Sequence, residues 1–241
     1  MEDISRRHFH TAKDAELLDH SLAGKIDWES FYTEGKRTPP FLRNVPDENL
    51  VGFVNHGRLR SGNAIDLGCG IGRNAIYLAK AGFRVDAIDL SRVAIARGRL
   101  IAEEEGVRTN FIVGSVFDVT LRDNHYDVAY DAGLFHHLPP HRRPYYLELV
   151  RQAINPNGFF GMTCFDTTGG QPVEDWEIYE RGQMPPGIGY TENRLREILA
   201  GFLEILDLRP MKVCPESADA LGLPGTWTVL MKPLAPVERS Q

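Results

Sequence analysis

Long apolar runs are missing from the 241 residues of the chain. No stretch approaches the roughly 20 consecutive apolar residues that a membrane-crossing helix needs, so we expect no membrane partner. Residues 1–27 carry both charge signs and contain no apolar block, which is atypical of a secretory signal. The sequence therefore predicts a cytoplasmic protein.

Cysteines and basic residues are also scarce. The three cysteines, Cys69, Cys164 and Cys214, are too few and too widely spaced for a disulfide framework or a zinc site, which favours a reducing compartment. The 33 acidic residues outnumber the 27 basic ones and give a net charge of -6. Because nucleic-acid binders usually show a basic footprint, we expect no nucleic-acid partner.

From residue 61 onward, short apolar runs alternate with helical patterns, which predicts an α/β fold with a parallel sheet. Strands are expected at 63–67, 83–89, 109–114, 126–131 and 158–165, with helices at 73–81, after the capping residue Ser91, and at 142–154. A helix at 191–200 and extended runs at 202–208 and 226–231 follow, and two such neighbouring runs predict an antiparallel edge.

Two segments stand apart from this alternation. We interpret residues 1–27 as a polar N-terminal extension and 28–241 as one domain, with an N-terminal flap at 28–60. Residues 166–190 contain many Gly and Pro residues, and so long a connection is usually functional, so we expect a lid there. The aromatic residues expected to line an acceptor pocket from these segments are Tyr32, Trp176, Tyr179 and Tyr190.

The strongest motif is an apolar strand that ends in Asp-x-Gly-x-Gly-x-Gly, from Asp66 to Gly72. Glycines there let the backbone turn tightly and approach a nucleotide-like ligand. A dinucleotide loop would need G-x-G-x-x-G, with glycine at Arg73, so NAD is disfavoured. A carboxylate at Asp66 suits an ammonium group, and Asp89, about twenty residues on, suits ribose hydroxyls.

These residues resemble the class I S-adenosylmethionine-dependent methyltransferases, and Gly72-Arg73-Asn74-Ala75 is similar to the tellurite-resistance and thiopurine branch. The resemblance implies S-adenosyl-L-methionine as cofactor and S-adenosyl-L-homocysteine as product. It also implies a Rossmann-like seven-stranded, mostly parallel sheet with an antiparallel last strand and helices on both faces. Where the family has an acid after the third strand, this chain has Gly114-Ser115-Val116-Phe117, so the Ser115 hydroxyl or the Val116 backbone would take its place.

The cofactor contacts expected from the motif and the resemblance come from Tyr32, Asp66, Gly68, Cys69, Gly70, Asn74, Asp89, Leu90, Ser115, Val116 and Asp131. Leu90 would lie beside the adenine. Cys69 is interpreted as a small packing residue of the loop rather than a nucleophile or metal ligand, because no partner stands at ligand spacing.

The transfer site is predicted after the fourth strand, at residues 131–138, because ligands of open α/β sheets lie beyond the carboxyl ends of the strands. Asp131, His136 and His137 are the catalytic candidates, and a histidine there is suited to remove a proton from the acceptor. A structural, hydrogen-bonded histidine is the alternative. We expect no metal, because Pro139 and Pro140 interrupt the His137–His141 spacing.

Methyltransferases of nucleic-acid bases usually carry an Asn/Asp-Pro-Pro-aromatic run at this position, and Asp131-Ala132-Gly133-Leu134 does not match it. A small molecule accepting at sulfur, oxygen, nitrogen or a metalloid is therefore favoured. Two alternatives stay open: a catalytically silent S-adenosylmethionine-binding protein and an NAD-dependent oxidoreductase. The sequence leaves the acceptor's identity and the oligomeric state open.

Overall fold

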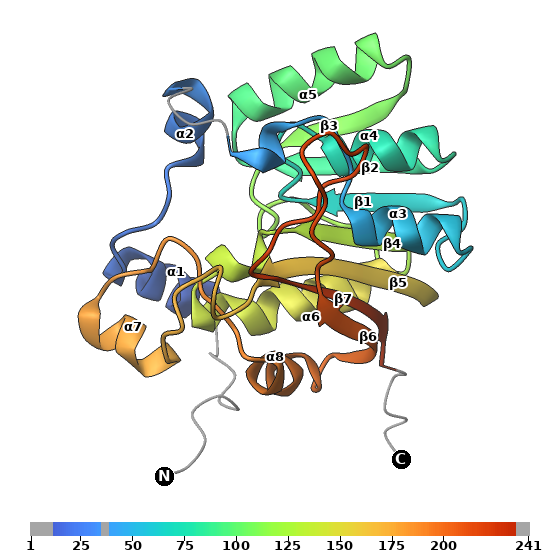
Figure 1. Cartoon of the computed structure of the whole chain (residues 1–241). Coiled ribbons are helices and arrows are strands. Elements are labelled where there is room, and N and C mark those ends of the chain that lie inside the picture. The colour runs from blue at the N-terminus through green and yellow to red at the C-terminus, as the bar shows by residue number, and fades with distance from the viewer. Residues whose placement is uncertain (1–11, 35–38, 235–241) are drawn as a thin grey trace.

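A computed structural model describes residues 12–34 and 39–234, which form a seven-stranded sheet in the order β3-β2-β1-β4-β5-β7-β6 (Figure 1). The strands are β1 (Asn63–Leu67), β2 (Arg84–Asp89), β3 (Thr109–Val113), β4 (Tyr126–Ala132), β5 (Ile154–Phe165), β6 (Leu203–Pro210) and β7 (Thr226–Pro233). The helices are α1 (Ala12–Ser21), α2 (Trp28–Glu34), α3 (Glu48–Asn55), α4 (Arg73–Lys80), α5 (Arg92–Glu104), α6 (Arg143–Ala153), α7 (Asp175–Arg181) and α8 (Glu192–Leu199), with short 3-10 turns at Pro40–Leu42, Phe135–His137 and Pro140–Arg142.

The strand directions confirm the predicted mostly parallel sheet. Strands β1 to β5 pair in parallel, whereas β7 runs antiparallel to both of its neighbours, β5 and β6. The antiparallel strand therefore lies one position inside the edge, which β6 forms. Strand β5 begins earlier than the predicted residue 158, because a register shift opposite Tyr126 and Val128 lets Ile154 join the ladder.

Side chains alternate between the two faces of the sheet, and each face has its own core. In β1, Ile65 and Leu67 pack on the face that α6 and α8 cover. Ala64 packs on the opposite face, with apolar residues of α3, α4 and α5. The helices on both faces bury the strands, so polar side chains reach a ligand only at the strand ends.

The N-terminal helix α1 is tied to the connection after β4. Asp19 of α1 accepts hydrogen bonds from the guanidinium of Arg142, and its other oxygen lies 3.0 Å from Nε2 of His141. Ala15 on the same helix is fully buried. Helix α1 therefore packs against the domain, whereas the rest of the predicted polar extension, residues 1–11, lies outside the described residues. Within the described segments, no helix is both long enough and apolar enough to cross a membrane.

Candidate active site

One cavity opens at the carboxyl ends of the parallel strands, where the motif analysis places the site. The predicted residues in its lining are Tyr32, Gly68, Cys69, Gly70, Asn74, Asp89, Leu90, Ser115, Val116, His136 and His137. The structure thus brings together side chains from the N-terminal flap and from the ends of β1, β2, β3 and β4. Asp66 and Asp131 do not belong to the lining.

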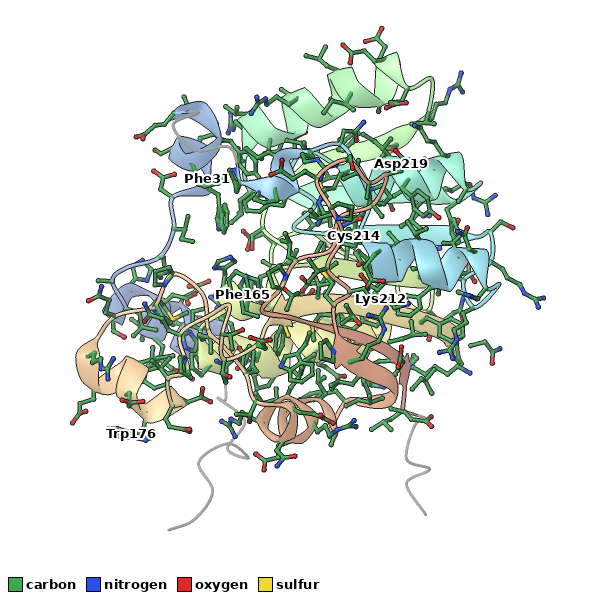
Figure 2. All side chains as sticks on the ribbon, viewed as in Figure 1. Phe31, Phe165, Trp176, Lys212, Cys214 and Asp219 are labelled. Carbon is green, nitrogen blue, oxygen red and sulfur yellow. The ribbon has the colours of Figure 1, made fainter. Side chains whose placement is uncertain are left out.

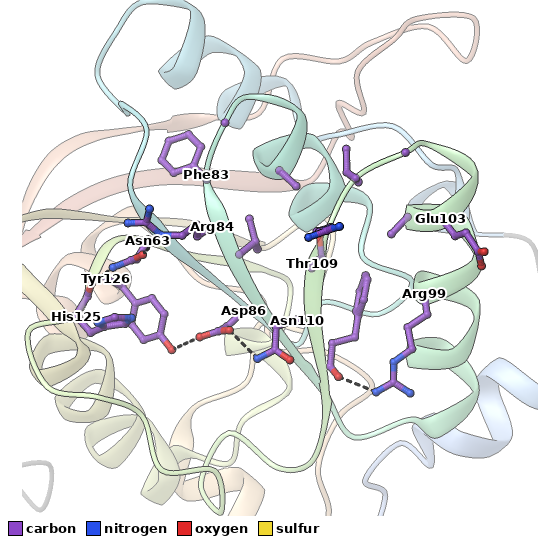
Figure 3. A pocket seen from close by; sticks show the side chains of 18 of the residues that line it. Asn63, Phe83, Arg84, Asp86, Arg99, Glu103, Thr109, Asn110, His125 and Tyr126 are labelled. Atoms are coloured by element: carbon purple, nitrogen blue, oxygen red, sulfur yellow. Dashed lines mark hydrogen bonds between the residues drawn. The ribbon is translucent and has the colours of Figure 1, made fainter.

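A second depression lies at the opposite, amino ends of the strands, beside Asn63, Arg84 and Thr109 (Figure 3). Its central acid, Asp86, accepts hydrogen bonds from the Tyr126 hydroxyl at 2.7 Å and the Asn110 amide at 2.8 Å. This depression is open and contains no glycine loop. The chemistry of the motif therefore belongs to the first cavity.

The glycine loop forms the floor of the cavity. Gly68 and Gly70 both have positive φ angles, 69° and 55°, which favour glycine. A Cβ atom on Gly70 would stand 2.5 Å from the hydroxyl oxygen of Tyr32, so the flap approaches the loop at this point. The amide of Gly70 donates to Asp89 Oδ2 at 2.8 Å. Loop, flap and the end of β2 are thereby held together.

Asp89 lies where an acid would meet ribose hydroxyls. Its second oxygen accepts from the Ser91 amide at 2.8 Å, and burial raises the pKa of the carboxyl group. The Ser91 hydroxyl donates to Glu29 of α2 at 2.6 Å. Because Glu29 belongs to the flap, this contact anchors α2 over the end of β2.

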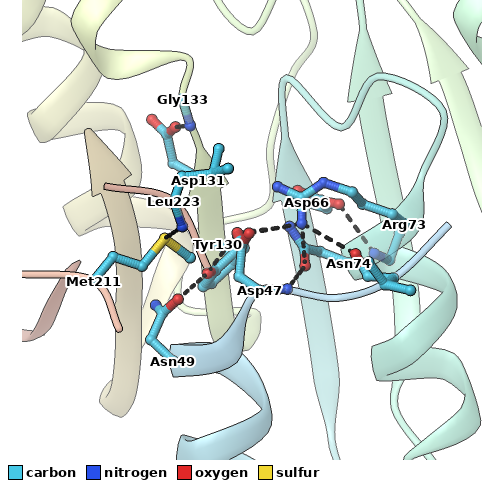
Figure 4. Close-up of polar contacts among 12 residues, drawn as sticks. Asp47, Asn49, Asp66, Arg73, Asn74, Tyr130, Asp131, Gly133, Met211 and Leu223 are labelled. Carbon is cyan, nitrogen blue, oxygen red and sulfur yellow. Dashed lines mark hydrogen bonds and ion pairs between the residues drawn. The ribbon is translucent and has the colours of Figure 1, made fainter. Parts of the chain in front are cut away.

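Asp66 lies below the loop, at the end of β1 (Figure 4). The residue is 1% exposed, and its Oδ2 accepts from the Ala75 amide at 3.0 Å. Burial raises the pKa of Asp66 to about 7, while nearby Arg73 opposes that shift. Its Oδ1 is buried with no hydrogen-bond partner among the described residues. An unpaired carboxylate oxygen is suited to a cationic group.

A buried polar network beside Asp66 was not foreseen from the sequence. Asp47, just before α3, forms an ion pair with Arg73 at 2.7 Å and accepts from the Asn74 amide at 3.1 Å (Figure 4). The Tyr130 hydroxyl donates to the same carboxylate at 2.9 Å. Asp47, Arg73 and Asn74 all line the cavity. The only sequence signal was Arg73 itself, a charged residue at the first position of a helix that faces the core.

Asp131 lies beneath the cavity rather than in its wall. Its carboxylate accepts from the amides of Gly133 at 3.0 Å, Leu134 at 2.7 Å and Phe135 at 3.1 Å, and from the Tyr146 hydroxyl at 2.6 Å. Burial raises its pKa to about 7, against the effect of these donors. The geometry makes Asp131 the group that shapes the turn carrying the histidines.

The two adjacent histidines differ in hydrogen bonding. The ring of His136 stacks on Phe165 with centroids 3.8 Å apart, and its Nδ1 accepts from the Phe165 amide at 3.3 Å. Burial holds the pKa of His136 well below its usual value, so the ring is neutral, with its proton on Nε2. His136 is therefore a donor.

His137 has the complementary arrangement. Burial lowers its pKa to about 4, and a hydrogen bond with the backbone of Pro186 opposes that shift. Proline has no N–H, so the His137 ring donates to the carbonyl group and its other nitrogen keeps a lone pair. The ring also packs edge-on against Trp28 of the flap, at 4.9 Å. His137 is therefore the ring with an acceptor nitrogen.

His141 is directed away from the cavity. Its Nδ1 lies 2.9 Å from the Tyr179 hydroxyl and its Nε2 lies 3.0 Å from Asp19. Within residues 12–34 and 39–234, no three His, Cys, Asp or Glu side chains gather as metal ligands would.

The aromatic residues of the predicted lid, 166–190, do not reach the cavity. Trp176 is 62% exposed at the outer margin of the molecule, away from Phe165 (Figure 2). Tyr179 contacts His141, and Tyr190 packs against Phe135 at 5.6 Å. These three were expected to line the pocket and lie outside its lining. The segment instead lies behind His136, whose carbonyl accepts from the Ile188 amide at 2.9 Å.

A different segment forms the part of the cavity wall that residues 166–190 were expected to form. The loop between β6 and β7, residues 211–225, crosses the sheet toward α3 and α4 (Figure 1) and contributes Met211, Leu221 and Leu223 to the lining. Leu221 bonds the backbone on both sides of Asp47, donating to the Pro46 carbonyl at 2.7 Å and accepting from the Glu48 amide at 2.9 Å. From the sequence, these residues were expected only to join the extended runs at 202–208 and 226–231.

Comparison with known proteins agrees with the motif. Residues 64–158 match the model of a methyltransferase domain. A 2-heptyl-1-hydroxyquinolin-4(1H)-one methyltransferase from Mycobacteroides abscessus is 26% identical over 176 residues, which are 73% of each chain.

Solved structures share the fold. The 1,6-didemethyltoxoflavin-N1-methyltransferase of Burkholderia thailandensis, solved with its substrate and S-adenosylhomocysteine, superposes with a TM-score of 0.64 at 20% identity and covers 93% of this chain and 91% of its own. TehB from Haemophilus influenzae gives a TM-score of 0.59 at 18% identity over 85% of this chain and 66% of its own. The predicted sheet and cofactor are confirmed.

Proposed function

Because the chain is a class I S-adenosylmethionine-dependent methyltransferase, we propose that it methylates an oxygen or nitrogen atom of a small ring compound in the cytoplasm. The observation that carries the proposal is one cavity that both the glycine loop and His137 line. The hydroxyquinolone and toxoflavin-precursor enzymes support it, since both act on ring compounds.

The residues of the cavity fit S-adenosylmethionine. The glycine at position 70 lets Tyr32 of the flap approach the loop, and Asp66, directly below the lining, is proposed to offer its buried Oδ1 to an ammonium group. Asp89 is proposed to bind the ribose, with Leu90, Ser115 and Val116 around the adenine, while Tyr32, Gly68, Cys69 and Asn74 enclose the remainder. When bound, the cofactor supplies an electrophilic methyl group and leaves as S-adenosylhomocysteine.

His137 is proposed to orient the acceptor. Its unprotonated nitrogen accepts a hydrogen bond from the acceptor's O–H or N–H, which directs a lone pair of the same atom toward the methyl group. As the new bond forms, that nitrogen takes the proton and later releases it to water. His136 accepts at Nδ1 and carries its proton on Nε2, so Nε2 is its hydrogen-bond donor. Asp131 is proposed as a positioning residue, because it fixes the turn that carries both rings.

The test is methyl transfer from labelled S-adenosylmethionine to a panel of hydroxylated, amino and thiol ring compounds. We expect turnover with a hydroxyl or ring N–H acceptor. His137→Ala is expected to lower kcat by about 100-fold or more, the usual contribution of a positioned acid or base, with unchanged cofactor affinity in calorimetry. His56→Ala is the matched control, because His56 is exposed, directly follows α3 and lies outside the lining.

Cofactor binding without turnover of any acceptor would instead support the silent binding protein. Binding of NADH without binding of S-adenosylmethionine would instead favour an NAD-dependent oxidoreductase. A His137→Ala variant as active as the His56→Ala variant would leave methyl transfer in place and remove the role of His137.

A further inference from the structure

The cavity divides at β1 into two halves. Gly70, Asp89 and Ser115 belong to the cofactor half, because β2 and β3 lie on one side of β1. The strands β4, β5 and β7 lie on the other side, so the residues at their ends form what we call the acceptor half. Its members are His137, Phe165, Met211, Leu221, Leu223 and Thr226.

Fixed charge is absent from the acceptor half. Among described residues that line the cavity within 132–138, 163–165 and 211–226, none is Asp, Glu, Lys or Arg. The charged residues Lys212 and Asp219 belong to the same loop and are exposed to solvent (Figure 2). His137 is neutral above about pH 4. An ionic acceptor would therefore lose its hydration with no counter-charge from a side chain of this half to replace it.

Among the described residues, the remaining charged side chains of the lining offer no unpaired cation. Asp47 and Arg73 neutralise each other at 2.7 Å, and Asp89 accepts two backbone hydrogen bonds. Arg73 could bind an anion only if its buried ion pair with Asp47 were broken, and Asp89 is itself an acid.

The apolar wall of this half is built by close packing. The Leu223 amide donates to the sulfur of Met211 at 3.4 Å, and the Met211 amide donates to the Thr226 carbonyl at 2.8 Å, so the two ends of the loop are held together. Phe165, which pairs with Thr226 in the β5–β7 ladder, adds an aromatic ring that is stacked on His136. Flat faces and polarizable sulfur favour a planar aromatic guest.

We infer that Met211, Leu221 and Leu223 make loop 211–225 an apolar specificity wall, so that the acceptor is an uncharged planar aromatic compound and oxyanions are rejected. The inference rests on the proposed function for its chemistry. It narrows the set of acceptors that the sequence left open, because a metalloid oxyanion or an aromatic carboxylate would meet no Lys or Arg side chain in this half.

The test compares 8-hydroxyquinoline with a carboxylated 8-hydroxyquinoline and with tellurite, first by calorimetric binding to the S-adenosylhomocysteine complex and then by methyl transfer. We expect the neutral compound to bind at least about 100-fold more tightly than either anion, since about 1.4 kcal/mol corresponds to each tenfold step. Met211→Lys and Leu223→Lys place a cation in the wall and are expected to shift this ratio about tenfold or more toward the carboxylate.

Val213→Lys is the matched control, because Val213 lies on the same loop, 66% exposed and outside the lining. It is expected to leave the ratio unchanged. Leu223 is only half-buried, so Leu223→Lys is expected to fold and keeps the test valid if Met211→Lys misfolds. Equal binding of neutral and anionic compounds, or an unchanged ratio in both wall variants that still bind S-adenosylhomocysteine, overturns the inference. Failure of the wild-type protein to bind S-adenosylhomocysteine would overturn the proposed function instead.

Discussion

At the residue scale, the close approach of Tyr32 to the glycine loop makes Gly70 a sensitive position. Gly70→Ala adds a methyl group 2.5 Å from the Tyr32 hydroxyl at a φ of +55°. Backbone strain of this kind costs about 1–3 kcal/mol, so we expect S-adenosylmethionine affinity in calorimetry to fall by about 10-fold or more.

The double variant Gly70→Ala/Tyr32→Phe separates the two causes. Removing the hydroxyl relieves the clash, because the next ring atom of Tyr32 lies 3.5 Å from the added carbon, but it leaves the left-handed backbone strained. Partial recovery of affinity is expected. Full affinity in the single variant would contradict a close contact between flap and loop.

The raised pKa of Asp66 predicts a pH dependence of cofactor binding. The carboxyl group has a pKa of about 7 in the free protein and is mostly neutral below that pH. A bound ammonium favours the ionised form, so binding releases a proton below pH 7 and affinity rises with pH, by up to about tenfold per unit between pH 5.5 and 7. Calorimetry of S-adenosylhomocysteine across that range measures it.

Two controls isolate Asp66. Asp66→Asn keeps an oxygen for the Ala75 amide and is expected to bind more weakly with a flat pH profile. 5'-Methylthioadenosine lacks the ammonium group and is expected to show no such slope with the wild-type protein. An unchanged slope in Asp66→Asn would assign the proton to another group.

Residue identity predicted the tight turns of the glycine loop, because Asp-x-Gly-x-Gly-x-Gly needs only local backbone geometry. The role of Asp131 could not be predicted in this way. An acid at a strand end can face the ligand or fold back onto the next turn. Here three consecutive backbone amides and the Tyr146 hydroxyl hold the Asp131 carboxylate against that turn. That choice depends on where α6 packs.

At the scale of elements, the buried pair of Asp47 and Arg73 joins the segment before α3 to α4. Asp47→Ala leaves the Arg73 guanidinium buried without its ion-pair partner and removes the nearer of the two acceptors of the Tyr130 hydroxyl, which keeps only Asn49 at 3.2 Å. Breaking a buried ion pair from one side costs about 3–5 kcal/mol. The free energy of unfolding from urea titration is expected to fall by about that amount.

Lys80→Ala provides the comparison, because Lys80 pairs with Glu105 at the surface, where both side chains are exposed. An exposed pair contributes about 0–1 kcal/mol, so this variant is expected to unfold almost as the wild type does. Equal losses in the two variants would show that the Asp47 network adds no stability.

Strand positions followed closely from hydrophobic periodicity, but the helices before residue 61, helix α7 and the choice of covering segment did not. Residues 166–190 have the Gly and Pro content of a lid, whereas the cavity wall comes from 211–225. The difference lies in the order of the last strands. Because β7 runs antiparallel to both β5 and β6, the loop that joins β6 to β7 begins and ends at the carboxyl ends of the parallel strands, beside the cavity. Composition alone carries no information about that order of strands.

At the scale of the whole molecule, the cavity is lined by the N-terminal flap, the carboxyl ends of β1 to β5 and the C-terminal loop, so a ligand there contacts segments far apart in the sequence. A ligand that binds only the folded state stabilises it by about 2.7 kcal/mol at 100 times its Kd. For a domain of this size that corresponds to a rise in Tm of about 5–10 °C. Thermal unfolding with S-adenosylhomocysteine is expected to show this shift.

The specificity of the shift identifies the ligand class. Asp89→Asn replaces the proposed ribose acid without removing its bulk, and it is expected to lose most of the rise in Tm at the same ligand concentration. NADH is expected to give no shift, because Arg73 occupies the position at which a dinucleotide loop needs glycine and its ion pair with Asp47 fills the space beside the helix start. A shift with NADH but not with S-adenosylhomocysteine would mean that the cavity accepts a pyrophosphate despite that pair.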